Sequence, residues 1–221
     1  MKNQVFNIVL AIVTALVVTG VGFAQESVTV TANMMTVEVK THPATGEVRT
    51  VPDSSATLLT NEDGAWFHMS TSEFENGHVY TIWWVIMNNP DECASRPCTG
   101  ADVFGNSDAV QSELTLGDTI LMDEEANVSL AGFLPIGEVE SEWYGNGFTN
   151  PTGAEIWVVV NHHGPLIPDE AGDMLNTYRG GCTEDSAQMG PFPETGMADG
   201  TPGPNTCLLY QIATFPQGMD E

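Results

Sequence analysis

The sequence predicts an all-β protein: an antiparallel β-sandwich, or flattened barrel, of about eight strands with long disulfide-stapled loops. Three observations lead to this fold class. Short runs of β-branched and aromatic residues recur along the chain, turns rich in Gly, Pro and Asn separate them, and a single short segment has a helical pattern. Four cysteines, an even number, indicate disulfides in an exported chain.

A secretory signal peptide is predicted at residues 1–24. A lysine precedes an apolar run over residues 5–18, and small residues crowd the expected cleavage site after Ala24. The alternative is an uncleaved membrane anchor, but the small residues favour cleavage. No later stretch is long and apolar enough for a membrane span, so we expect a secreted, periplasmic or cell-surface protein. Residues 25–221 are expected to form one β-sandwich domain.

The strands of the first half are predicted from alternating apolar residues. In chain order they cover residues 35–40, 56–59, 65–71 and 79–87, and residues 47–51 are expected to return as a hairpin partner of the first. The run at 79–87 is apolar at both parities, which is typical of a central strand that is covered on both faces. Trp83 and Trp84 are therefore expected to point into opposite layers.

The second half has fewer strands and longer loops. Strands are predicted at residues 119–122, 128–134, 154–161 and 208–215, and one short helix at 170–178, ended by two glycines. Residues 99–111 have no clear periodicity. Residues 141–153 and 183–206 are expected to be loops.

The cysteines allow three pairings. Proximity in sequence favours Cys93–Cys98, which closes a tight loop, and Cys182–Cys207, which ties a long Gly- and Pro-rich loop to the last strand. The two bridges restrict these loops and do not replace a hydrophobic core.

The mature chain is strongly acidic. Four Lys and Arg remain against 30 Asp and Glu, a formal net charge of −26. Such a surface repels nucleic acid and anionic lipid and attracts cations or basic partners; it also keeps an exported protein soluble. Asp102, Asn106 and Asp108 lie in one loop and offer oxygen ligands of the kind that Ca²⁺ prefers, so we consider a Ca²⁺ site there, although their spacing differs from that of an EF-hand.

One loop has the composition of a ligand site. Trp143, Tyr144, Asn146 and Phe148 combine aromatic planes with an amide, which suits stacking on a glycan or contact with an extracellular protein. The alternative is that the aromatic rings tuck under the loop and fill one end of the sandwich.

The histidines give the second site hypothesis. His162 and His163 follow the predicted strand 154–161. Adjacent histidines on a strand would point to opposite faces, but Gly164-Pro165 indicates that the strand has ended, so either histidine with His68 or His78 suits copper or zinc. The alternative is that they pack and form hydrogen bonds. No nucleophile elbow, zinc-protease helix, phosphate loop or dinucleotide fingerprint is present, so no catalytic residue is predicted and an enzyme is disfavoured.

Two resemblances are carried by short motifs. Residues 80–93, with His163-Gly164-Pro165 and Gly180-Gly181-Cys182, resemble a group of uncharacterised exported bacterial proteins, a likeness that implies no activity or ligand. Residues 43–46, together with the same His-Gly-Pro, resemble the CHRD domain but lack its His-x-His pattern. That likeness implies an extracellular β-fold with a binding or structural role.

The leading expectation is therefore a non-enzymatic exported β-sandwich that binds or assembles outside the cytoplasm. The alternative is an exported hydrolase or metal-dependent enzyme with a site near His162 and His163. The arrangement of His68, His78, His162 and His163 in space would distinguish the two.

Overall fold

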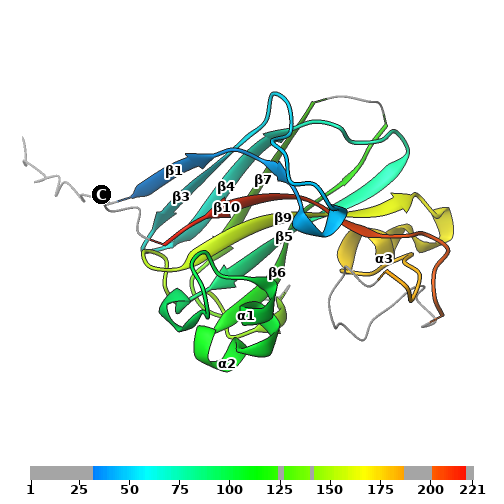
Figure 1. Ribbon diagram of the computed structural model, residues 1–221. Helices are drawn as coiled ribbons and strands as arrows, with labels where there is room; N and C mark the ends of the chain where they lie inside the picture. Colours follow the sequence, from blue (N-terminus) through cyan, green and yellow to red (C-terminus); the bar gives the residue numbers. More distant parts are fainter. Residues whose placement is uncertain (1–31, 124–126, 140–141, 187–200, 218–221) are drawn as a thin grey trace, which may run out of the picture.

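The computed structural model describes residues 32–123, 127–139, 142–186 and 201–217. The predicted signal peptide lies outside them. Two antiparallel sheets face each other (Figure 1). Sheet A has the strand order β1 (Asn33–Val37), β3 (Ser55–Asn61), β4 (Gly64–Thr71) and β7 (Val128–Pro135). Sheet B has the order β2 (Lys40–Thr41), β10 (Leu208–Phe215), β9 (Glu155–Pro165), β5 (His78–Met87), β6 (Ser112–Leu121) and β8 (Glu142–Gly145).

The predicted fold class is confirmed, with more strands than expected. The largest difference is β6, which begins at Ser112 and pairs with β5 along its whole length, whereas only residues 119–122 were predicted as a strand. Glu113, Gly117 and Asp118 obscure its alternation. Residues 47–51 form no full strand, but they do return beside residues 39–41. Thr50 makes an antiparallel bridge to Lys40, and backbone hydrogen bonds from Thr41 N–H to the Arg49 carbonyl and from Val51 N–H to the Val39 carbonyl flank it.

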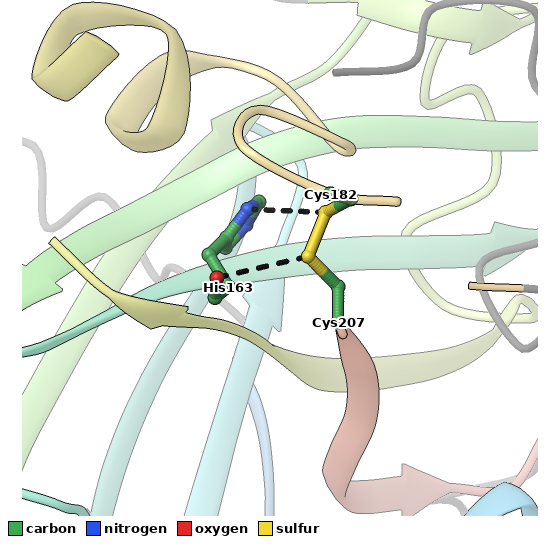
Figure 2. Close-up of side chains that lie close together, drawn as sticks. All are labelled: His163, Cys182 and Cys207. Carbon is green, nitrogen blue, oxygen red and sulfur yellow. Dashed lines mark hydrogen bonds between the residues drawn. A yellow bond between two sulfur atoms is a disulfide. The ribbon is translucent and has the colours of Figure 1, made fainter. Parts of the chain in front are cut away.

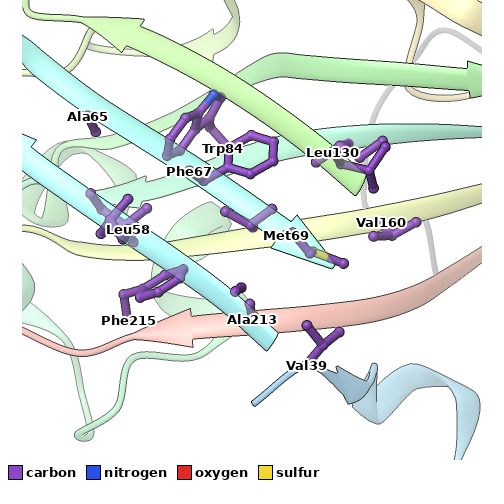
Figure 3. Packing of buried hydrophobic residues seen from close by; sticks show 14 of the residues in the cluster. Val39, Leu58, Ala65, Phe67, Met69, Trp84, Leu130, Val160, Ala213 and Phe215 are labelled. Carbon is purple, nitrogen blue, oxygen red and sulfur yellow. The ribbon is translucent and has the colours of Figure 1, made fainter. Parts of the chain in front are cut away.

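The inner core lies between the two sheets (Figure 3). Phe67 of β4 meets Trp84 of β5 edge to face, with ring centroids 5.0 Å apart. A Cβ atom at Gly132 of β7 would come within 2.6 Å of the Phe67 ring, so this close approach requires glycine. The mutual packing of these aromatic rings holds sheet A against the centre of sheet B.

The central position predicted for residues 79–87 is confirmed. Strand β5 pairs with β9 on one side and β6 on the other, and its side chains from Val79 to Met87 are buried. Trp84 enters the inner core, whereas Trp83 enters a second apolar cluster on the outer face of sheet B. There its ring meets Tyr178 at 5.0 Å.

Short helices build the layer outside sheet B (Figure 1). Helices α1 (Gly100–Gly105) and α2 (Ser107–Val110) form where no periodicity was visible, and α1 begins at a capping box between Thr99 and Asp102. The predicted helix at 170–178 is shorter, since α3 spans Ala171–Asn176. The 3-10 turns are η1 (Pro43–Thr45), η2 (Pro90–Glu92) and η3 (Pro168–Glu170).

Both predicted disulfides are present. Cys93 pairs with Cys98 and Cys182 with Cys207, each with Cα atoms 5.4 Å apart. Two such bridges are typical of a protein from an oxidising compartment. Within the described residues, no helix has the length and apolar character needed to cross a membrane.

Candidate functional site

A cavity lies on the outer face of sheet B, and the register of the strands builds its floor. Ile212 of β10 is paired with Val159 of β9, and one step along the sheet Trp157 of β9 is paired with Val85 of β5. Leu114 of β6 extends the second row beyond Val85. Because side chains two residues apart on a strand point to the same face, the two rows form one continuous apolar surface.

Two walls enclose this floor. One consists of the end of the Cys93–Cys98 loop and helix α1, with Pro97, Val103 and Phe104 bordering the cavity. The other consists of β2 and η1, with His42 and Val48, at the β10 edge of the sheet. The cavity between them has a volume of about 460 Å³.

The first wall is fixed to the sheet by a buried carboxylate. Glu155 of β9 is 1% exposed, and both of its oxygens accept hydrogen bonds from the Cys98 backbone N–H, at 3.1 and 3.2 Å. The Trp157 indole N–H donates to the same carboxylate at 2.8 Å. Glu155 therefore holds the disulfide loop and the Trp157 ring in place on the same side of the pocket.

The cavity surface is almost entirely apolar. Trp157, Leu209 and Ile212 are only half-buried, whereas Val85, Val159 and Leu114 beside them are buried. Cavities of this size with a few polar groups at the margin are typical small-molecule sites. The polar side chains on its border are Lys40, His42, Thr99, Tyr178 and Thr214.

His42 is the imidazole ring on this border. Its Nδ1 accepts a hydrogen bond from the Ala44 backbone N–H at 3.1 Å, as the N-cap of η1. Burial lowers the pKa of His42 to about 4, so the ring is neutral at pH 7. A neutral ring whose Nδ1 is an acceptor carries its proton on Nε2.

The predicted aromatic ligand loop is divided between two layers. Phe148 is fully buried in the inner core, Tyr144 lies near Phe104 at 6.0 Å on the outer side of sheet B, and Asn146 is exposed. Trp143 belongs to β8, but its side chain lies outside the described residues. The three described side chains of this loop, Tyr144, Asn146 and Phe148, do not converge on one surface.

Buried Asn88 explains why this loop is held down. Its amide donates to the carbonyls of Gln111 and Gly147, and its oxygen accepts from the backbone N–H groups of Thr149 and Asn150. The loop is thus tied to the end of β5, and Phe148 fills the core below it. Phe148 therefore follows the alternative expectation, in which the ring tucks under the loop and fills one end of the sandwich.

The acidic residues of the Ca²⁺ hypothesis have different surroundings. Asp102 is 3% exposed and accepts hydrogen bonds from Ala94 N–H and from the Thr99 N–H and hydroxyl, which lower its pKa. Asn106 donates to the Glu92 carbonyl, and Asp108 is exposed. Asp102 thus ties the disulfide loop to α1, and Ca²⁺ binding stays a prediction.

His162 and His163 point to opposite faces of sheet B. His163 is fully buried beside the Cys182–Cys207 bridge (Figure 2). Its Nδ1 donates to the Gly180 carbonyl at 2.9 Å, and its Nε2 accepts from the Thr81 hydroxyl at 2.8 Å. Burial lowers the pKa of His163 to about 4. Both ring nitrogens are satisfied, so this histidine has a structural place in the outer layer.

His162 instead meets His78 at the end of the sandwich. The His162 Nε2 and His78 Nδ1 atoms are 2.6 Å apart, and the His78 Nε2 is 3.6 Å from a Glu75 oxygen. The two imidazole planes are nearly parallel, 14° apart, and the ring centroids are 4.9 Å apart. This centroid distance equals the 2.6 Å between the nitrogens plus about one ring diameter, so the rings lie end to end. The nitrogens therefore face each other head-on, as in a hydrogen bond.

This Glu75–His78–His162 group contains the donor types of a metal site. A tetrahedral zinc ion, with Zn–N bonds of about 2.0–2.1 Å, needs its two nitrogens about 3.3 Å apart, so the rings would have to separate. Burial and the neighbouring His78 lower the pKa of His162 to about 4. Metal binding here stays a prediction, and His68 lies apart from it, on sheet A beside Ser129.

The pocket was not predicted from the sequence. Its floor residues come from β5, β6, β9 and β10. In β5 and in the middle of β9 both parities are apolar, so no parity could be assigned to solvent from the sequence. The available signal was Trp157 and Ile212, large apolar residues on the face opposite the inner core. Comparisons of this chain with protein-family models, with curated proteins and with solved structures found no match.

Proposed function

We propose that this protein is an exported, non-enzymatic binding protein whose pocket on the outer face of sheet B holds the apolar part of a small molecule. The observation that carries the proposal is the 460 Å³ cavity with a floor of half-buried Trp157, Leu209 and Ile212. A ligand that covers these side chains removes apolar surface from water. Each buried CH₂ group of such a ligand contributes about 0.8 kcal/mol.

The rigidity of the surroundings supports the proposal. The floor is a pair of rows in the centre of a hydrogen-bonded sheet, and Glu155 fixes the wall that the disulfide loop provides. A pocket that exists before the ligand arrives loses little ordering free energy on binding. The His163 network and the Cys182–Cys207 bridge hold the layer beside it in the same way.

The test is titration with the neutral fluorescent probe N-phenyl-naphthylamine. We expect saturable fluorescence enhancement with one site per chain, and Ile212→Trp should weaken it, because the larger ring projects from the floor and takes space from the probe. Leu59→Trp is the matched control, since Leu59 is also half-buried on a strand but lies on the outer face of sheet A. Equal enhancement in the two variants, with both folded by circular dichroism, would contradict the proposal.

A further inference from the structure

The few cations of this protein differ in whether they have a partner. Arg49 forms a two-point pair with Glu73, and Arg96 pairs with Asp91. Arg179 is mostly buried and donates to backbone carbonyls. Lys40 makes no ion pair with any of the described residues, and it borders the apolar pocket.

The strand register places Lys40 on the pocket face. It is paired with Ile212 across β2 and β10, and Ile212 in turn is paired with Val159 on the cavity floor. The lysine therefore continues the first floor row at the edge of sheet B. Its flexible stem suits contact with apolar surface while its ammonium group stays in water.

A second donor lies at the same edge. The Nδ1 of His42 is engaged with the Ala44 N–H, which leaves an N–H on Nε2 that has no acceptor among the described residues. Lys40 and His42 are two residues apart around β2, and both border the cavity. One end of an apolar pocket thus presents an ammonium group and an imidazole N–H.

The charge distribution around the pocket points the same way. The chain has 30 Asp and Glu, yet no carboxylate among the described residues borders the cavity. Repulsion from acidic residues elsewhere is screened over about 8 Å at physiological ionic strength. Local donors therefore decide which head group is accepted, and these donors select an anion.

We propose, building on the pocket function above, that the ligand is a single-chain amphiphile with a carboxylate head, taken from free solution. Its head pairs with Lys40 and His42, and its tail lies over the Val159 and Trp157 rows. The volume of 460 Å³ is near the lower end of the range for small-molecule sites and suits one chain.

Isothermal titration at pH 8 with three probes of equal chain length tests this inference: dodecanoate and dodecyltrimethylammonium, each below its micelle concentration, and dodecanol below its solubility limit. Dodecanoate should bind tightest. Lys40→Met should weaken the binding of dodecanoate by about fivefold to tenfold, because one partly exposed charge-assisted hydrogen bond is lost. The affinity for dodecanol should not change. Lys40→Arg, the matched control, should retain most of the dodecanoate affinity.

The outcomes separate the two proposals. If none of the probes binds, both the pocket function and the head-group inference fail. If dodecanol binds as tightly as dodecanoate and Lys40→Met changes neither, the pocket stands and the carboxylate inference is overturned. Tightest binding of the cationic probe would overturn it as well. Flotation of the protein with phosphatidylglycerol vesicles that is lost in Lys40→Met would also overturn the inference, because the ligand would then be a membrane lipid and not a free carboxylate.

Discussion

At the residue scale, histidines with similar sequence contexts have different surroundings. His162 and His163 are adjacent in the chain, but alternation along β9 directs one to the end of the inner core and the other to the outer layer. Opposite directions for neighbouring side chains on a strand could be predicted, but the strand itself was expected to end at residue 161, before both histidines, and β9 instead continues to Pro165. The partners could not be predicted, because Gly180 and Thr81 lie far away in sequence and reach His163 only through the fold.

His163 should make stability depend on pH. Its pKa is about 4 in the folded protein and 6.5 when exposed, so between these values the unfolded chain binds the proton more readily. The free energy of unfolding should therefore fall as pH drops from 6.5 to 4, by about 3 kcal/mol from this residue. Above about pH 7.5, where the histidine is deprotonated in both states, its contribution no longer changes with pH.

Urea unfolding of the wild type and of His163→Gln between pH 4 and 7 measures this effect. The variant should be less stable at pH 7 and should lose less stability on acidification. Both proteins also lose stability at low pH as their carboxylates become protonated. This includes Asp102, whose pKa is lowered in the folded protein, so the effect cancels in the comparison. His68→Gln controls for loss of an exposed imidazole. Parallel pH curves for wild type and His163→Gln would show that His163 titrates alike in both states.

At the element scale, strands with strong apolar runs could be predicted, whereas β6, α1 and α2 could not. Strand β6 carries Glu113 in a fully buried position, where its carboxylate accepts the Gly147 N–H at 2.8 Å. In the sequence, a charged residue at a buried position looks like the end of a strand, because the loop that supplies its hydrogen bond lies far away along the chain. Helix α1 exists because Thr99 and Asp102 form its capping box, and it is too short to show a period.

Strand β5 contributes one buried tryptophan to each layer, Trp84 to the inner core and Trp83 to the outer cluster. We therefore expect truncation of either ring to destabilise the fold to a similar extent. Trp83→Ala and Trp84→Ala should each lower the free energy of unfolding by about 3–5 kcal/mol, since each leaves a large cavity. Trp66→Ala is the control: its ring is half-buried and stacks on Phe133 on the outer face of sheet A. Urea midpoints at unchanged slope measure the three losses.

A Trp83→Ala protein as stable as Trp66→Ala would contradict this picture of β5. In that case the outer layer would not cover Trp83, despite the Tyr178 contact and the hydrogen bond from its indole N–H to Thr81 at 2.7 Å. Trp84→Ala serves here as the internal standard for a fully buried ring in the inner core.

At the scale of the whole molecule, sheet B is covered on both faces but not over all of its area. Sheet A covers the inner face, and α1, α3 and the disulfide-stapled segments cover much of the outer face (Figure 1). The pocket is the part of the outer face between these segments and β2. The sandwich and the disulfide pairing could be predicted from the chain, whereas this opening depends on where short, aperiodic segments pack.

Methyl NMR spectra recorded during titration with dodecanoate test pocket binding most directly. Methyl signals of Val85, Leu114, Val159 and Ile212, which border the cavity, should shift in a saturable way. Signals of Leu58 and Leu130 in the inner core, and of Leu59 on the outer face of sheet A, should stay in place. Absence of shifts at the four cavity residues, or larger shifts at Leu59, would contradict a binding site on the outer face of sheet B.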